Sequence, residues 1–224
     1  MVAFDADDTL WDCQGHFERV MQHLYTLLLP WTGSREQAAA ELFATERANM
    51  SQLGYGTKAF TLSVLETAMR VSRHEMPMAQ LYDLQQECYT LLHLPATPLP
   101  EVEATLEVLR RRQTEMVVFT KGELLDQEHK LERSGLGRYF SHVEITSDKG
   151  EREFRALCAR LAIEPQQLTM VGNSLKSDIA PALAIGARAV HIPFSITWEL
   201  EQHDGLIHPR LTTIDSFGQL LEVL

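Results

Sequence analysis

Short apolar runs that end in polar residues recur along this chain, and segments with helical spacing separate them. The first run, Val2-Ala3-Phe4, leads directly into the carboxylates of Asp5, Asp7 and Asp8. An apolar run before a burst of acids is typical of a buried strand that ends at a turn. Like charges this close repel one another unless a cation neutralises them, and hard carboxylate oxygens favour Mg²⁺. The alternative interpretation is an acidic turn that precedes a helix cap.

Further buried strands are expected over residues 115–119, 143–145, 168–171 and 189–192. Strands that alternate with helices predict an α/β fold, a Rossmann-like, doubly wound parallel sheet with helices on both faces. Parallel strands bring their carboxyl ends to one edge of the sheet, where ligands bind in open sheets of this kind. The polar residues expected at this edge are Asp5, Asp7, Thr120, Lys149, Asn173 and Asp178.

The first strand is separated from the other strands by a long insert. Residues 15–94 have apolar positions at helical spacing and almost no strand character, so they predict an all-helical domain. Three prolines within 95–100 make a stiff connection back to the core, because each fixes its own φ and restricts its predecessor. The predicted organisation is an α/β core of residues 1–14 and 95–224, with a helical domain of residues 15–94 inserted after the first strand.

Charge and composition restrict the partners of this chain. The 20 Lys and Arg against 31 Asp and Glu give a formal net charge of −11, which disfavours nucleic acid or an anionic membrane surface as a general partner. Cys13, Cys88 and Cys158 lie far apart without metal-ligand spacing, which indicates reduced thiols in a cytoplasmic protein. No apolar run approaches the length that spans a bilayer, and the first segment does not resemble a signal peptide. The oligomeric state stays open.

The order and chemistry of the strand ends resemble the haloacid dehalogenase superfamily of phosphohydrolases. The resemblance covers nearly the whole chain, from the Asp-x-Asp-x-Thr motif of Asp5, Asp7 and Thr9 to the loop of residues 172–178. The insert directly after this motif resembles the helical cap of the first type (C1) in that superfamily. The resemblance implies a Mg²⁺-dependent phosphatase that acts on a small phosphorylated metabolite through an aspartyl-phosphate intermediate.

The resemblance also implies a role for each residue at the strand ends. Asp5 would attack phosphorus, and Asp7 would act as general acid and then as general base. Thr120 and the backbone N–H of Lys121 would bind phosphoryl oxygens, while Lys149 would hold Asp5 and the phosphoryl charge. The metal contacts implied are Asp5, the backbone carbonyl of Asp7, Asp178 and Asn173.

The chain departs from the common pattern of the superfamily at two of these positions. The loop often begins Gly-Asp, whereas here it begins Gly172-Asn173. Compared with aspartate, asparagine keeps an oxygen acceptor but lacks the negative charge. Its contact with the metal would therefore pass through water. Lys149 is followed by glycine in place of the frequent proline, so Lys121 and Lys176 are alternative lysines for the site.

Three other functions are compatible with the same motifs. A phosphomutase or phosphotransferase would use the same aspartyl-phosphate and differ only in the acceptor. A non-enzymatic phospho-acceptor or metal-binding module, as in response-regulator receivers, also has Asp, Thr and Lys at strand ends. Asp7 argues against it, because a stable phospho-signal should lack a built-in acid and base. A 2-haloacid dehalogenase is the least favoured, since a halide needs no proton and that branch lacks the second Asp and the metal.

The helical insert contains two candidates for substrate contact. Glycines flank Tyr55 in the sequence Gly54-Tyr55-Gly56-Thr57-Lys58, which suggests a loop that approaches a ligand closely. Lys58 would meet an anionic substrate, although a plain helix connection with a solvated lysine is the alternative. Trp198 is a candidate wall of the pocket, with core or interface packing as its alternative.

If Lys58 contacts the substrate, Lys58→Ala raises KM and changes kcat much less, because the lost contact is made before and during the reaction alike. Steady-state kinetics would measure both constants. An unchanged KM would remove Lys58 from the site.

Overall fold

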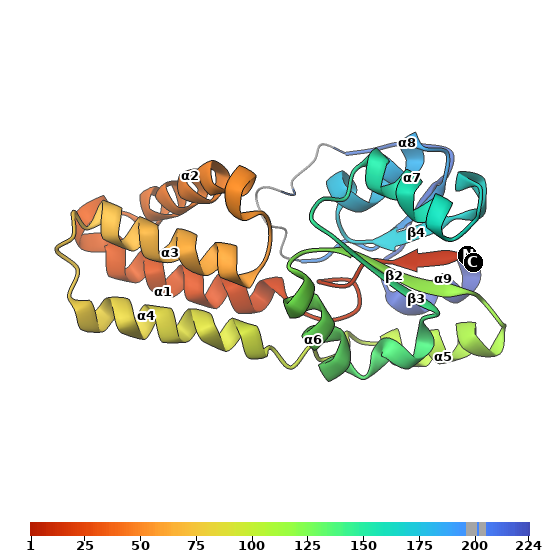
Figure 1. Cartoon of the computed structure of the whole chain (residues 1–224), viewed down its shortest axis with the longest axis horizontal. Coiled ribbons are helices and arrows are strands. Elements are labelled where there is room, and N and C mark those ends of the chain that lie inside the picture. Colours follow the sequence, from red (N-terminus) through yellow and green to blue (C-terminus); the bar gives the residue numbers. More distant parts are fainter. Residues whose placement is uncertain (196–200, 202–204) are drawn as a thin grey trace. The chain divides into compact units, whose positions relative to one another are not determined.

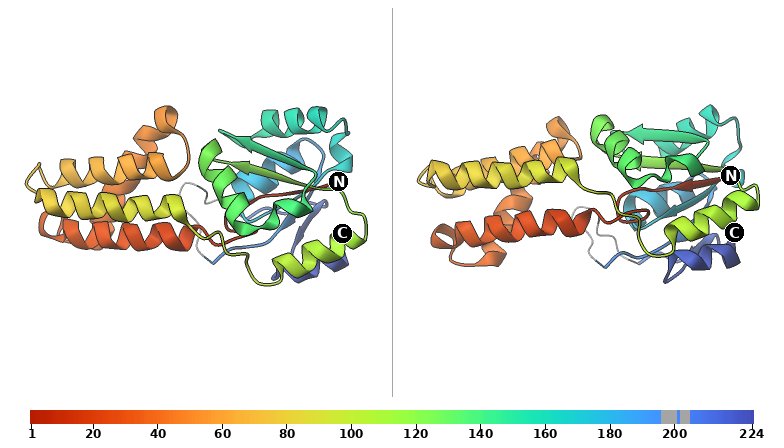
Figure 2. Two further views of the ribbon diagram at one scale, coloured as in Figure 1. Left: turned by 60° about the horizontal axis from the view of Figure 1, so that its bottom comes forward. Right: turned by 90° about the horizontal axis from the view of Figure 1, so that it is seen from below.

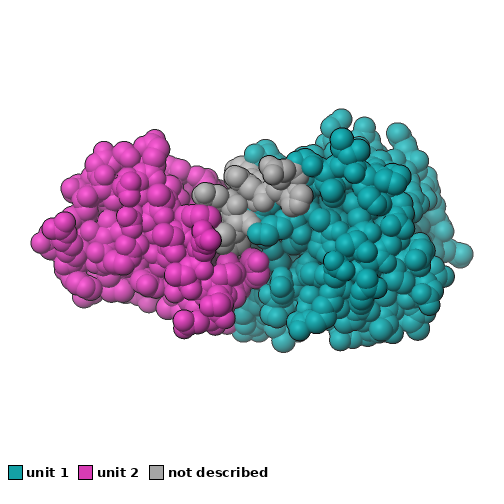
Figure 3. All heavy atoms as spheres, turned by 90° about the horizontal axis from the view of Figure 1, so that it is seen from above, with its two compact units in different colours: residues 1–14, 95–224 teal, residues 15–94 magenta. Residues whose placement is uncertain are grey.

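The computed structural model describes residues 1–195, 201 and 205–224, and Trp198 lies outside them. The chain divides into two compact units, which are shown in different colours in Figure 3. Unit 1 consists of Met1–Gln14 and Pro95–Leu224, and unit 2 of Gly15–Leu94.

Unit 1 contains a six-stranded sheet in which every pair of neighbours is parallel (Figure 1). The strands are β1 (Val2–Phe4), β2 (Met116–Lys121), β3 (His142–Thr146), β4 (Thr169–Gly172), β5 (Arg188–His191) and β6 (Leu211–Thr213). Their order across the sheet is β3-β2-β1-β4-β5-β6, so β1 lies between β2 and β4. The predicted α/β fold with a parallel, Rossmann-like sheet is confirmed.

Helices lie on both sides of this sheet (Figure 2). The α-helices of unit 1 are α5 (Val102–Arg111), α6 (Leu124–Ser134), α7 (Glu151–Arg160), α8 (Ala180–Ala184) and α9 (Leu220–Val223). Shorter turns occur at Leu136–Tyr139, Pro165–Gln167, Leu175–Ile179 and Phe217–Gln219, of which Leu175–Ile179 is π-helical.

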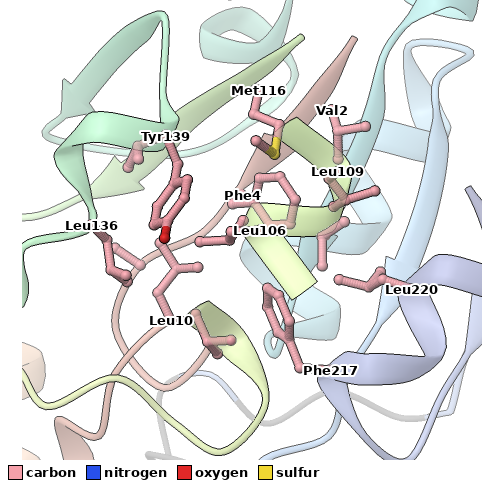
Figure 4. Close-up of a cluster of buried hydrophobic side chains, with 14 of the residues drawn as sticks. Val2, Phe4, Leu10, Leu106, Leu109, Met116, Leu136, Tyr139, Phe217 and Leu220 are labelled. Atoms are coloured by element: carbon pink, nitrogen blue, oxygen red, sulfur yellow. The ribbon is translucent and has the colours of Figure 1, made fainter. Parts of the chain in front are cut away.

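The first strand is buried on both of its faces. Val2 and Phe4 pack into a cluster with Leu106 of α5 and Leu220 of α9, part of which is drawn in Figure 4. Ala3 points to the opposite face, because successive side chains of a strand alternate, and it packs into the cluster that contains α7 and α8 residues. Burial on both sides fixes β1 at the centre of the unit, and the residues that follow it are held at the carboxyl edge of the sheet.

Unit 2 is all-helical. Its helices are α1 (Gln14–Thr32, which begins one residue before the unit), α2 (Arg35–Leu53), α3 (Thr57–Val71) and α4 (Met78–Thr90), followed by a 3-10 turn at Leu91–His93. Apolar side chains from all four helices are buried, among them Leu28, Leu42, Val64 and Leu84. Within the described residues of the whole chain, no helix is both long and apolar enough to cross a bilayer.

Ser34 caps the start of α2, because its Oγ accepts a hydrogen bond from the backbone N–H of Gln37 at 3.1 Å. Ser34→Ala removes this acceptor and is expected to lower the free energy of unfolding by about 1 kcal/mol. Urea titration followed by circular dichroism measures the loss. Ser51→Ala, at an exposed position of the same helix, is the matched control and should leave the free energy within about 0.5 kcal/mol of wild type. Equal losses in both variants would contradict a capping role.

Candidate active site

The centre of the site is a lysine shared by two buried carboxylates. Lys149 Nζ donates to Asp5 Oδ1 at 2.7 Å and to Asp178 Oδ1 at 2.6 Å. Asp5 follows β1, Asp178 lies in the turn after β4, and Lys149 lies in the loop after β3. Lys149 and Asp178 are 2% and 1% exposed, so this ion pair is shielded from solvent. Three segments far apart in the sequence therefore meet at one edge of the sheet.

The charges in this cluster do not balance, because one ammonium faces two carboxylates. Burial, and then the charge of Asp178, raise the pKa of Asp5 to about 7, although Lys149 opposes the change. Burial alone would lower the pKa of Lys149, but the two carboxylates outweigh it and raise that pKa above its usual range. The cluster would therefore gain from an additional positive charge.

Of the three lysines considered from the sequence, Lys149 is the one that contacts Asp5. Lys176 is exposed. Lys121, the last residue of β2, pairs through its Nζ with the carboxylate of Glu201. The pKa of Glu201 is lowered, because Lys121 and two serine hydroxyls outweigh the effect of burial.

The loop after β4 fits tightly around Asp178. The backbone N–H of Ser174 donates to Asp178 Oδ2 at 2.9 Å, which fixes the side chain beside Lys149. A Cβ added at Gly172 would lie 2.3 Å from the same oxygen and 2.7 Å from Asp178 Cβ, closer than real Cβ contacts. Gly172 is thus required by the close approach of Asp178 to the backbone.

Thr9 connects the first motif to this loop. Its hydroxyl lies 3.3 Å from Asp5 Oδ2 and 3.2 Å from Asn173 Oδ1. Asn173 and Asp5 thus lie on either side of one hydroxyl group. Thr120, at the end of β2, is 3% exposed and lies 3.4 Å from Gln127 Nε2.

The donor atoms at this edge suit a hard divalent cation. The carboxylates of Asp5 and Asp178 and the amide oxygen of Asn173 are ligands of the type that Mg²⁺ prefers, and the excess negative charge is of the sign that a cation offsets. In the described part of the chain, no group of three or more His, Cys, Asp or Glu side chains is placed to hold a metal. The carboxylates of Asp5 and Asp178 would act with neutral oxygens, and Mg²⁺ commonly keeps several waters in such sites.

Asp7 lies in a different environment from Asp5. Its Oδ1 accepts from Trp11 Nε1 at 2.7 Å and from Lys130 Nζ at 2.9 Å, and its Oδ2 accepts from Lys130 Nζ at 2.7 Å and Gln127 Nε2 at 2.9 Å. Burial by itself raises the pKa of Asp7, but Lys130 and the other two donors outweigh it and hold that pKa below its usual value.

Three residues near the site are missed by the sequence reasoning: Gln127, Lys130 and Glu201. Gln127 and Lys130 lie on the charged helix α6, where the sequence pattern is typical of a solvated face, yet both are buried. Their spacing of three residues places them on the same side of the helix, which is a weak signal. Glu201 lies outside every predicted strand or helix, so no signal in the sequence indicated its contacts.

The two candidates for substrate contact belong to unit 2. Gly54 and Gly56, on either side of Tyr55, have φ of 68° and 114°, which glycine adopts without strain. Tyr55 is half-buried, and Lys58 is exposed in the first turn of α3. Their contact with a substrate stays a prediction.

Comparison with known proteins identifies the family of this chain. Residues 1–186 match the sequence model of the haloacid dehalogenase-like hydrolases. The chain belongs to this family.

Its similarity to individual proteins extends over nearly the full length. The chain is 24% identical over 233 residues to glyceraldehyde 3-phosphate phosphatase of Methanothermobacter thermautotrophicus, with 100% of this chain and 98% of the relative covered. It is 28% identical over 204 residues to N-acylneuraminate-9-phosphatase of Rattus norvegicus, with 84% and 79% covered. The crystal structure of a haloacid dehalogenase-like family hydrolase from Xanthomonas campestris superimposes with a TM-score of 0.87 at 26% identity, over 99% of this chain and 90% of that one.

Gly172→Ala is expected to lower the free energy of unfolding of this hydrolase by about 1–3 kcal/mol, because the new methyl group must displace Asp178 or the backbone. Urea titration measures the loss. Gly205→Ala is the matched control, since a Cβ there meets no atom within 4 Å, and it should change the free energy by less than about 0.5 kcal/mol. A Gly172→Ala variant as stable as wild type would contradict this expectation, because the loop would then accommodate the added methyl group without loss of stability.

Proposed function

We propose that this hydrolase is a Mg²⁺-dependent phosphatase that cleaves a small phosphomonoester through an aspartyl-phosphate intermediate. The observation that carries the proposal is the contact of Lys149 with both Asp5 and Asp178 at the carboxyl edge of the sheet. Phosphoryl transfer needs positioning and charge neutralisation more than other chemistry, and this cluster offers both.

The named relatives support a phosphatase that acts on a small molecule. Glyceraldehyde 3-phosphate and an N-acylneuraminate 9-phosphate, from which the two relatives take their names, are both small phosphomonoesters. Asp7 supports the same chemistry, because an alkoxide leaving group needs a proton and a halide does not. We expect the enzyme to act in the cytoplasm on a phosphorylated metabolite.

In the first half-reaction, a bond forms between a carboxylate oxygen of Asp5 and phosphorus. The bond from phosphorus to the leaving oxygen breaks with its electron pair on that oxygen, and Asp7, which enters this step as the protonated carboxylic acid, gives that oxygen its proton and becomes a carboxylate. Lys149 holds Asp5 and offsets the phosphoryl charge, and Thr120 with the backbone N–H of Lys121 binds phosphoryl oxygens. The products of this step are an alcohol and the aspartyl-phosphate.

In the second half-reaction, a water oxygen attacks phosphorus and gives a proton to Asp7. The bond between phosphorus and Asp5 breaks with its electron pair on the Asp5 oxygen, which releases inorganic phosphate and restores the Asp5 carboxylate and the protonated Asp7. Asp5, Asp178, Asn173 and the backbone carbonyl of Asp7 would hold Mg²⁺. When bound, the ion supplies positive charge against the carboxylates and the phosphoryl oxygens.

Unit 2 is proposed to act as a helical cap over the substrate. Caps and lids in enzymes exclude water and contribute to substrate choice. Its glycine-flanked Tyr55 and its exposed Lys58 are the candidates for that contact.

Asp5→Asn is expected to lower kcat for p-nitrophenyl phosphate and for a panel of small phosphomonoesters by at least about 10³-fold, because the nucleophile is lost. Steady-state phosphate release with Mg²⁺ and with EDTA measures this. EDTA should stop the wild-type enzyme, and added Mg²⁺ should restore it. Asp215→Asn, an exposed aspartate of unit 1, is the matched control and should retain wild-type kcat.

Other outcomes point to the other functions. Phosphate recovered on an added acceptor indicates a phosphotransferase, and release that stops after one equivalent indicates a phospho-acceptor module. Halide release from a 2-haloacid without metal indicates a dehalogenase. Any of these, or full activity in Asp5→Asn, contradicts the proposal.

A further inference from the structure

The carboxylate of Asp7 is held by an unusually complete set of donors. Lys130 Nζ contacts both of its oxygens, at 2.9 and 2.7 Å. Trp11 donates to one oxygen and Gln127 to the other. Each carboxylate oxygen offers two acceptor positions, so these four contacts fill them. Asp7 is therefore fixed in one orientation.

Burial of the Lys130 ammonium costs hydration free energy. The residue is 2% exposed on α6, and its ammonium also lies 3.6 Å from Asp126 Oδ2 and 3.9 Å from Cys13 Sγ. A buried ion pair often stabilises a protein no more than well-packed apolar residues of similar size, because both charges lose their hydration. A gain in fold stability therefore does not explain well why a lysine is buried at this position. Its contact with both oxygens of Asp7 suggests a role in function instead.

Helix α6 connects Asp7 to the phosphate-binding end of β2. Gln127 donates through the same Nε2 to Asp7 Oδ2 at 2.9 Å and to the backbone carbonyl of Lys121 at 3.0 Å. Lys130 is one helical turn further along and reaches the same carboxylate. The helix therefore sets the position of Asp7 relative to the strand end where Thr120 and Lys121 lie.

We propose that Lys130, assisted by Gln127 and Trp11, is a positioning residue that directs the Asp7 carboxyl group toward the leaving oxygen of the substrate. To hold the proton that it gives to the leaving oxygen, Asp7 must release one of its four donor contacts, and the remaining donors keep the carboxyl group in place. The inference rests on the proposed function, since it assigns Asp7 to the leaving group of a phosphomonoester.

The test compares two esters that differ in their need for a proton. Phenyl phosphate has a poor leaving group that must be protonated, and 2,4-dinitrophenyl phosphate has a phenolate that leaves without a proton. The constant kcat/KM is measured for both, because it reports the steps up to departure of the leaving group. Lys130→Met should lower kcat/KM about 10- to 100-fold for phenyl phosphate and less than about threefold for the dinitrophenyl ester.

Two further variants complete the comparison. Lys130→Arg keeps a donor cation and should restore part of the loss on phenyl phosphate. Arg133→Met, at an exposed position of the same helix, is the matched control and should leave both constants unchanged. Equal loss on both esters in Lys130→Met would show a structural role and overturn the inference. A gain on phenyl phosphate would also overturn it, because the lysine would then restrain Asp7.

Trp11→Phe keeps an aromatic ring and removes only the indole N–H donor, so it tests the inference even if Lys130→Met does not fold. It should show the same dependence on the leaving group with a smaller loss, and an equal effect on both esters would contradict the inference. Failure of wild type to release phosphate from either ester would overturn the proposed function, and the inference with it. Activity of wild type with a uniform loss in the variants overturns the inference alone.

Discussion

The site depends on the contact of one buried ammonium, that of Lys149, with two buried carboxylates. Burying these charges costs hydration free energy, which short contacts of 2.7 and 2.6 Å in part offset. Because Asp5, Asp178 and Lys149 follow three different strands, the contact requires those strands to end at the same edge. The parallel sheet supplies this condition, with β1 fixed between β2 and β4 by burial on both faces.

The sequence predicts the sheet well because its central strands are continuous apolar runs that are buried on both faces. β6 is not predicted, since Leu211–Thr213 is a short edge strand with two threonines and only partial burial. The proximity of Asp5, Asp178 and Lys149 is predictable from one rule, that the carboxyl ends of parallel strands share an edge. Gln127 and Lys130 follow no such rule: they lie within a charged helix, and whether its face is solvated or buried depends on tertiary packing.

Gly172 lies where the loop after β4 begins, and the side chain of Asp178 packs against its backbone. The sequence marks it only as the start of a loop, whereas the structure shows that any side chain there would overlap Asp178. The same carboxylate is held by the backbone N–H of Ser174 and by Lys149, so its position is determined from three directions. A site residue held this rigidly loses little conformational entropy when a ligand binds, which is the physical benefit of a preorganised site.

Asp5 and Asp7 are two residues apart, yet their environments move their pKa values in opposite directions. Asp5 shares its lysine with another carboxylate, and burial and that charge raise its pKa to about 7. Asp7 has Lys130 in contact with both of its oxygens, and its pKa is lowered despite burial. The surroundings favour the ionised form of Asp7, so Asp7 must gain a proton before it can act as the proposed general acid. A cation beside Asp5 and Asp178 would offset their repulsion and favour the ionised form of Asp5. The ionisation of Asp5 would then respond to a bound cation, whereas the ionisation of Asp7 is set by Lys130, Trp11 and Gln127.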